Sequence, residues 1–138
     1  DSGTVDKPIA RHKTDRKRMA IVEGGREAIT HYTVLKRYRG YTHMAFQLET
    51  GRTHQIRVHM ASIGCNLVGD QLYVKSKKTS LKGLDGETKA FVNAFPRQAL
   101  HAASLGFVHP RSGEKLQFSC GFPDDYLLLL DKLRGSLI

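Results

Sequence analysis

The sequence predicts an α+β fold with a mixed, mainly antiparallel sheet and flanking helices. Residues 29–48 alternate apolar with polar side chains on both sides of a turn, as a β-hairpin does, and residues 100–119 show the same pattern imperfectly. Residues 53–63 carry apolar side chains at helical spacing. Residues 123–134 begin with acidic and end with basic side chains, as the helix dipole favours. Two hairpins and two helices together indicate the α+β class.

The N-terminal part has no clean periodicity. Residues 1–10 contain few apolar side chains, and we expect a loop or a frayed end there. Residues 11–27 are basic and contain glycine, so we expect an irregular connection that touches phosphates or solvent. The first hairpin follows, because residues 29–38 alternate β-branched and aromatic with polar residues, Arg39-Gly40 provides a turn, and alternation resumes over 44–48.

The helix predicted over residues 53–63 has a start and a stop signal. The hydroxyl of Thr53 can cap its start, and Gly64 is suited to the left-handed position that follows a helix. Its apolar stripe consists of Ile56, Met60 and Ile63. With that stripe facing inward, Arg57 and Gln55 project from the first turns, near the positive end of the helix dipole, which suits an anion or a carboxylate.

The C-terminal half contains shorter elements. Residues 67–70 predict a tight turn, and residues 74–90 predict a solvated loop that runs into a short helical turn through Phe91 and Phe95. The second hairpin is predicted as a strand over 100–108, a Pro-Arg-Ser-Gly turn, and a strand over 115–119.

The chain is strongly basic. Its 138 residues include 22 Lys and Arg against 13 Asp and Glu, a net charge of +9. This excess favours a polyanionic partner through counterion release, and the alternative is a soluble protein that is merely basic. Clustering favours nucleic acid. The basic clusters occupy residues 11–18, 36–39 and 75–82.

Composition excludes several classes of protein. Hydrophobic residues make up 40% of the chain, which is enough for a core. No apolar run approaches the roughly 20 residues that a membrane span needs, and the polar N-terminus shows no signal peptide. Cys65 and Cys120 lack CxxC spacing, so we expect reduced thiols in a cytoplasmic protein.

The histidines do not form a metal-binding pattern. His54 and His59 are five residues apart, which puts them about 140° apart on a helix, and no HExxH or Cys/His tetrad is present. A serine hydrolase would need a G-x-S-x-G elbow, and phosphate-cradling loops would need a glycine spacing that Gly24-Gly25 and Gly51 do not provide. We therefore predict no metal site.

Four motifs occur in a fixed order along the chain. They are Thr50-Gly-Arg-Thr-His-Gln-Ile-Arg-Val-His-Met60, Leu67-Val-Gly-Asp70 with Tyr73, Arg97-Gln-Ala-Leu-His-Ala102, and His109-Pro110. In content and order they resemble the RluA/RluD-type pseudouridine synthases, which act on structured RNA, and the resemblance runs from about Ile9 to Arg134. It implies isomerisation of uridine to pseudouridine, with large-subunit ribosomal RNA as the partner and no metal or organic cofactor.

The family's nucleophile is not in this chain. Its aspartate lies in a His-Arg-Leu-Asp motif that precedes the matched region, and no such motif occurs in residues 1–138. The active-site tyrosine that follows that aspartate in the family is also missing. The chain therefore resembles the C-terminal portion of a pseudouridine synthase catalytic domain, and we expect it to be inactive alone.

Arg57 matches the family arginine that forms a salt bridge with the catalytic aspartate, and the alternative is an exposed helix cation. An arginine–carboxylate fork holds the acid ionised and oriented, as a nucleophile requires. The residues predicted to bind RNA or substrate are Arg52, His54, Gln55, Tyr73, Leu100, Arg16, Lys17 and Arg18.

For four of these residues a second role stays open. His54 and Gln55 could equally hold the start of the helix, Tyr73 could anchor a loop, and Leu100 could belong to the core. Two rival functions also remain: a non-catalytic basic RNA-binding module, and a nuclease built around His54 and His59.

Overall fold

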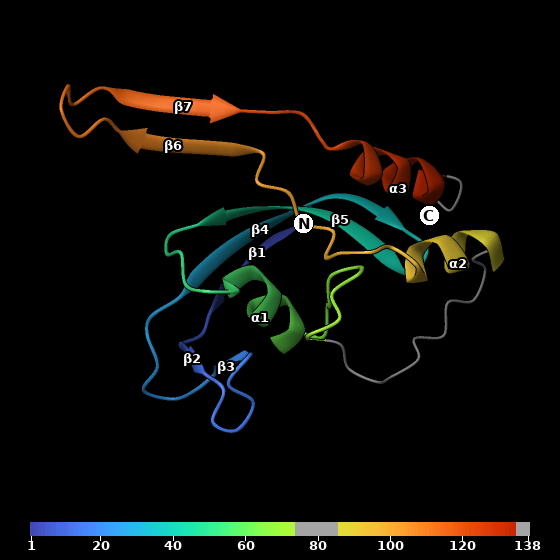
Figure 1. Cartoon of the computed structure of the whole chain (residues 1–138), viewed down its shortest axis with the longest axis horizontal. Coiled ribbons are helices and arrows are strands. Elements are labelled where there is room, and N and C mark those ends of the chain that lie inside the picture. Colours follow the sequence, from blue (N-terminus) through green and yellow to red (C-terminus); the bar gives the residue numbers. More distant parts are fainter. Residues whose placement is uncertain (74–85, 135–138) are drawn as a thin grey trace.

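The computed structural model describes residues 1–73 and 86–134 and confirms the α+β class (Figure 1). Its strands are β1 (Ser2–Asp6), β2 (Ile9–Arg11), β3 (Met19–Ile21), β4 (Ile29–Tyr38), β5 (Tyr41–Leu48), β6 (Ser104–Val108) and β7 (Lys115–Ser119). Its helices are α1 (Gln55–Ser62), α2 (Gly86–Asn93) and α3 (Asp124–Arg134).

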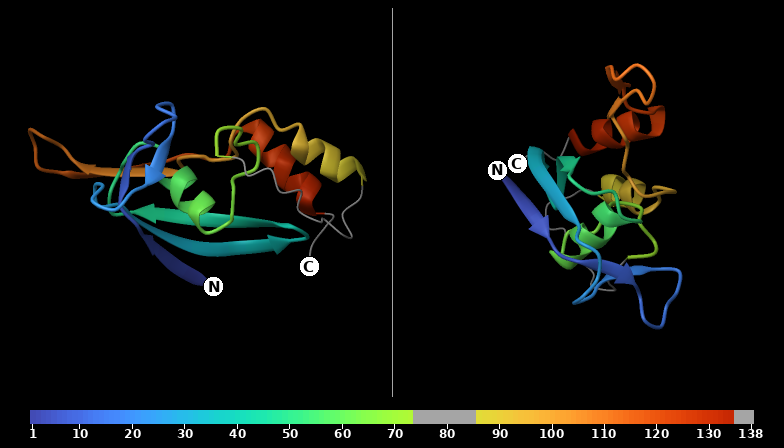
Figure 2. Two further views of the ribbon diagram at one scale, coloured as in Figure 1. Left: turned by 90° about the horizontal axis from the view of Figure 1, so that it is seen from below. Right: turned by 90° about the vertical axis from the view of Figure 1, so that its left-hand side faces the viewer.

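The main sheet is antiparallel, with the strand order β1-β4-β5. The predicted β4–β5 hairpin is confirmed: Tyr38 pairs with Tyr41 across a two-residue turn in which Gly40 has a φ of 76°. The register shifts between Val34 and Lys36, which leaves Leu35 in a bulge with 55% of its surface exposed. All three helices lie on the same face of this sheet (Figures 1 and 2).

The N-terminal prediction was wrong. Residues 2–6 form β1, which pairs with β4 from Ser2↔Thr33 to Asp6↔Ile29. Residues 9–11 pair with residues 19–21 in a short hairpin that was not predicted. Although apolar residues are few here, Val5 and Ile9 are both buried, and the backbone of β1 is hydrogen-bonded to β4, a strand distant in sequence.

Helix α1 is two residues shorter at its start than predicted, and Thr53 is not its cap. His54 occupies that position without a side-chain capping bond. The buried face is also different: Gln55, Val58, His59 and Met60 are buried, whereas Ile63 of the predicted stripe is 39% exposed. The predicted stop is confirmed. Gly64 has a φ of 81°, and the N–H of Cys65 reaches the carbonyl of Met60 at 2.8 Å.

The core has two clusters of buried apolar side chains. One joins Tyr38 of β4 to α2 and α3, and the other packs Ile9, Ala28, Val58 and Tyr73 around the inner side of α1. The first cluster explains why α2 is a full helix, longer than the predicted turn, because Val92 buries its inner face.

The second hairpin and the last helix are confirmed, although β6 begins at Ser104 and not at Leu100. The basic cluster at 75–82 lies outside the described residues. No helix in the described ranges is long and apolar enough to cross a membrane.

Candidate active site at the start of helix α1

The turn over residues 67–70 places Asp70 beside α1. Gly69 has a φ of 76°, and a Cβ on it would meet the carbonyl oxygen of Arg97 at 1.9 Å, so only glycine fits this approach. The N–H of Ala99 donates to the carbonyl of Val68 at 2.7 Å and fastens the turn to the following segment. Asp70 is consequently buried, with 2% of its surface exposed.

Arg57 forms a two-bond fork with Asp70. Its Nε and Nη2 donate to the two carboxylate oxygens, each at 2.9 Å, and the guanidinium lies over the Tyr73 ring at 5.0 Å. The Asp70 carboxylate also accepts the backbone N–H groups of Leu72 and Tyr73. Burial raises the pKa of Asp70, but the hydrogen bonds and the charge of Arg57 outweigh it and hold this pKa below its ordinary value. The same fork raises the pKa of Arg57.

Gln55 uses all of its hydrogen-bonding capacity inside the chain. Its amide oxygen accepts bonds from the Thr50 hydroxyl and the Arg52 N–H, and its amide nitrogen donates to the carbonyl of Ile29 and the hydroxyl of Thr30. With 3% of its surface exposed, it holds the start of α1 against β4. This placement favours the structural role over RNA contact.

His54 has an unusual backbone conformation. Its φ of 55° and ψ of 23° are left-handed, and no other non-glycine residue in residues 1–73 and 86–134 has a positive φ. Its Nδ1 lies 2.7 Å from the Tyr73 hydroxyl, which in turn accepts the backbone N–H of Met19 at 3.0 Å. Burial and the charge of Arg57 lower the pKa of His54. Tyr73 therefore links the start of α1 to β3.

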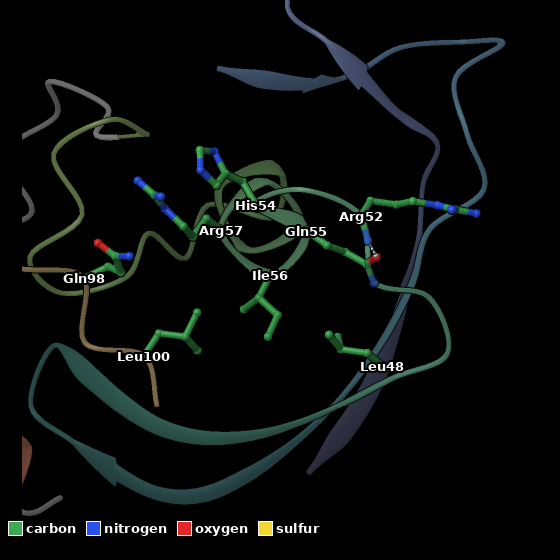
Figure 3. Close-up of a pocket in the computed structure, with 8 residues that line it drawn as sticks. All are labelled: Leu48, Arg52, His54, Gln55, Ile56, Arg57, Gln98 and Leu100. Atoms are coloured by element: carbon green, nitrogen blue, oxygen red, sulfur yellow. Dashed lines mark hydrogen bonds between the residues drawn. The ribbon is translucent and has the colours of Figure 1, made fainter. Parts of the chain in front are cut away.

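A pocket of about 330 Å³ opens beside these residues (Figure 3). Leu48, Ile56 and Leu100 provide apolar side chains, and His54, Gln55, Arg57 and Gln98 provide polar ones. Arg52 also lines it, but its side chain points away from the apolar residues and donates from Nε to the carbonyl of Glu27 at 2.8 Å. A pocket with an apolar wall and a few convergent polar groups suits a small-molecule ligand.

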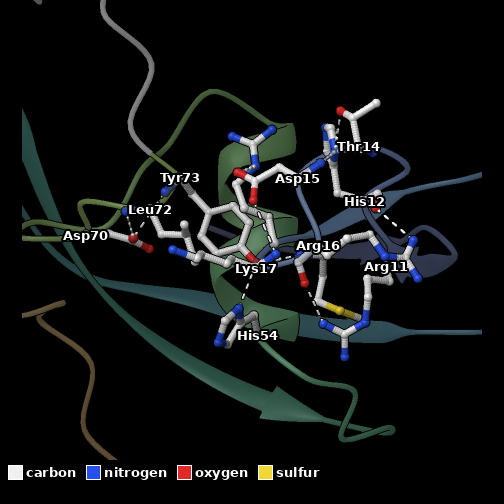
Figure 4. A network of polar contacts seen from close by, with 12 residues as sticks. Arg11, His12, Thr14, Asp15, Arg16, Lys17, His54, Asp70, Leu72 and Tyr73 are labelled. Atoms are coloured by element: carbon white, nitrogen blue, oxygen red, sulfur yellow. Dashed lines mark hydrogen bonds and ion pairs between the residues drawn. The ribbon is translucent and has the colours of Figure 1, made fainter.

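Tyr73 lies between His54 and the basic loop that joins β2 and β3 (Figure 4). Arg16 and Lys17 are exposed there, and Arg18 is half-buried beside Asp15 at 3.5 Å. Since Met19 is bonded to the Tyr73 hydroxyl, this loop is held next to His54. The three predicted RNA contacts and the predicted catalytic residue thus share one region of the molecule.

The structure gives Arg57 a partner that the sequence analysis did not identify. We predicted a carboxylate from outside this chain, and the recorded partner is Asp70, which stands in the quoted Leu-Val-Gly-Asp motif. Gln98 was missed as well, although it belongs to the Arg97–Ala102 motif. The four motifs could have pointed to both residues, because the fold brings these motifs, which are far apart in sequence, to one place.

His59 does not fit the nuclease hypothesis. It is fully buried, its Nδ1 accepts the Thr30 hydroxyl at 2.7 Å, and its Nε2 donates to the carbonyl of Lys7 at 2.9 Å. It therefore cannot reach a substrate together with His54. Within residues 1–73 and 86–134, no group of three or more His, Cys, Asp or Glu could hold a metal ion.

The chain is similar in sequence to RNA pseudouridine synthases. Residues 1–62 match the RNA pseudouridylate synthase family. The chain is 46% identical over 133 residues to the ribosomal large subunit pseudouridine synthase D of Pseudomonas aeruginosa, covering 96% of this chain and 41% of that protein. It is 45% identical over 136 residues to the uncharacterized RNA pseudouridine synthase YlyB of Bacillus subtilis, covering 99% and 40%. The chain spans about two fifths of the length of these curated relatives.

Solved structures agree in fold. Human RNA pseudouridylate synthase domain containing 1 superposes with a TM-score of 0.68 at 23% identity, covering 99% of this chain and 60% of that one. Human RNA pseudouridylate synthase domain containing 4 superposes with a TM-score of 0.66 at 25% identity, covering 96% and 56%.

Proposed function

We propose that this chain belongs to the RNA pseudouridylate synthase family and that the intact protein isomerises uridine to pseudouridine in RNA. Relatives named for the large ribosomal subunit support ribosomal RNA as the substrate. The observation that carries the proposal is the position of Arg57, a buried-edge cation fixed by Asp70 at the border of a partly apolar pocket. Cys65 and Cys120 are exposed free thiols, and this supports the proposal that the protein acts in the reducing cytoplasm.

Arg57 retains hydrogen-bonding capacity for a second acid. A guanidinium has five donors, and Asp70 takes the edge formed by Nε and Nη2. No described residue is bonded to Nη1. A nucleophilic aspartate from the rest of the protein could approach that edge and be held ionised and oriented. In this arrangement Asp70 fixes the arginine and the arginine fixes the nucleophile.

The pocket has a shape and chemistry that suit a uracil ring. Leu48, Ile56 and Leu100 can pack against the faces and edges of a base, and polar groups border it. A uridine inside an RNA structure must leave its stack to enter, which costs a few kcal/mol. The basic loop of residues 12–18 can offset that cost by binding nearby phosphates. This chain then supplies the base pocket and the oriented arginine, and other parts of the intact protein supply the nucleophile.

The test is turnover of ribosomal RNA by the intact protein and by Arg57→Lys. Lysine keeps the charge but lacks the planar fork, so pseudouridine formation should fall at least about tenfold, roughly 1.4 kcal/mol of barrier, with RNA affinity nearly unchanged. Arg52→Lys is the matched control and should be tolerated, because Arg52 makes a single bond to a carbonyl. RNA binding without any pseudouridine from the unaltered protein would favour the non-catalytic RNA-binding module.

A further inference from the structure

The Tyr73 hydroxyl lies between two partners whose chemistry fixes its proton. It accepts the N–H of Met19 at 3.0 Å, and it lies 2.7 Å from Nδ1 of His54. A tyrosine hydroxyl has one hydrogen to donate, and Nδ1 is the only acceptor recorded for it among the described residues. The hydroxyl therefore donates to Nδ1, and the proton of the neutral imidazole resides on Nε2.

The two rings hold each other in this geometry. Tyr73 is 7% exposed, its ring meets the His54 ring edge-to-face at a centroid distance of 5.6 Å, and Arg57 covers its face. The left-handed backbone of His54 costs free energy, and strain of this kind persists where the surrounding structure enforces it. Since α1 could begin with a relaxed residue, the strain points to a use for the position of this side chain.

The charges around His54 favour the neutral ring. Arg57 and Arg11 are the cations that act on it, and Asp70, already paired with Arg57, is the one acid. Burial and Arg57 together lower the pKa of His54, so the ring is an N–H donor and not a cation near neutral pH. A neutral donor can bind an oxygen acceptor without competing with Arg57 for a carboxylate.

We propose that Tyr73 is a positioning residue that fixes His54 in its Nε2–H form, and that this N–H donates to an oxygen of the RNA bound beside Arg57. The proposal rests on the proposed function for the identity of the ligand. The same hydroxyl holds Met19 of β3, so it fixes the position of the basic loop relative to the His54 donor, and one RNA molecule can contact both.

The first test is ¹⁵N NMR of the histidine rings in the intact protein, which does not depend on activity. His54 should show a protonated Nε2 and an unprotonated Nδ1. His59, whose Nε2 donates to the carbonyl of Lys7, is the internal reference. In Tyr73→Phe the His54 signals should move toward a tautomer mixture while those of His59 stay. A proton on Nδ1 of His54 in the unaltered protein would overturn the assignment.

The ligand is tested by adding inorganic phosphate, uridine or a ribosomal RNA fragment to the same sample. A shift of the His54 Nε2–H signal with phosphate identifies a phosphate oxygen, and a shift with uridine identifies a nucleoside oxygen. No shift with the RNA fragment would overturn the contact.

The second test is a double-mutant cycle on pseudouridine formation. Tyr73→Phe should lower turnover about three- to tenfold, the range expected for one hydrogen bond. His54→Gln keeps an N–H donor that does not need Tyr73, so Tyr73→Phe should have a smaller effect in this background, limited to the lost bond to Met19. Tyr41→Phe, which removes a hydroxyl in the other core cluster, should leave turnover unchanged. Equal effects of Tyr73→Phe in both backgrounds would show that Tyr73 does not act through His54, whereas an inactive unaltered protein would contradict the proposed function itself.

Discussion

The buried fork between Arg57 and Asp70 should couple these residues far more strongly than an exposed fork of the same geometry. The Asp70 side chain is 1% exposed and that of Arg57 is 13% exposed. Arg57→Met leaves a buried carboxylate with only two backbone N–H partners, and breaking a buried pair in this way costs about 3–5 kcal/mol. Asp70→Asn keeps the shape but removes the charge, at about 1.5–3 kcal/mol.

The double variant removes both ends of the pair at once. Its loss of stability should be smaller than the sum of the two single losses, by about 2–3 kcal/mol, which is the upper part of the range for contacting residues. The measurement is the free energy of unfolding in urea for the unaltered protein, the two single variants and the double variant.

The chain contains a matched control in Arg97 and Asp125. That pair also has two bonds of 2.9 Å, but its side chains are 39% and 41% exposed. Water and salt screen such a pair, so its coupling should be much the smaller of the two. Similar couplings for both pairs would refute the claim that burial gives the Arg57–Asp70 fork its strength.

The pH dependence of the buried coupling has a definite sign. The pKa of Asp70 is lowered in the folded protein, so its contribution to stability is fully present above the unfolded value of about 3.9. That contribution is lost as the pH falls through the lower, folded value. The coupling measured at pH 7 should therefore persist to about pH 4 and decline below it, and a decline between pH 7 and pH 5 would contradict the assignment.

Three further outcomes are expected. Residues 1–138 alone should form no pseudouridine in ribosomal RNA while the intact protein does. Robust activity of the shorter chain would contradict the inference that the nucleophile lies outside these residues. Neutralising residues 16–18 should flatten the slope of log affinity against log salt by about 2 to 3 if all three contact phosphates, and an unchanged slope would exclude them. The charge-matched control neutralises cations of α2 and α3: Lys89, Lys132 and Arg134. Gly69→Ala should reduce stability by more than Gly113→Ala, because both glycines have positive φ but only at Gly69 would a Cβ meet backbone; equal losses in urea unfolding would contradict the close approach.

Local signals predicted the elements whose stabilising contacts are local. The β4–β5 hairpin follows from alternation around Arg39-Gly40, and the end of α1 follows from Gly64. The strands in residues 1–21 could not be predicted in the same way. Their side chains are mostly polar, and β1 exists because its backbone pairs with β4, 23 to 31 residues further along the chain.

The same distinction applies to the site. Arg57 could be singled out from its motif, but its pairing with Asp70 depends on a turn that is held in place by a contact between Gly69 and Arg97. The His54 conformation was equally hidden, because a left-handed histidine has no sequence signature of its own. The buried face of α1 was misassigned because it contains polar residues, Gln55 and His59, whose hydrogen bonds with β4 compensate for their burial.

The arrangement around Arg57 bears on how the proposed reaction would be accelerated. Asp70 fixes two of its nitrogens, Tyr73 covers one face of the guanidinium, and Asp70 itself is held by backbone N–H groups. An arginine held in this way loses little further freedom when a second carboxylate arrives, so more of that interaction remains to orient the nucleophile. A lysine in its place would be mobile as well as differently shaped. The tenfold loss expected for Arg57→Lys therefore reflects lost preorganisation, and it should appear in turnover, while RNA binding, which we propose depends on the basic loop, is preserved.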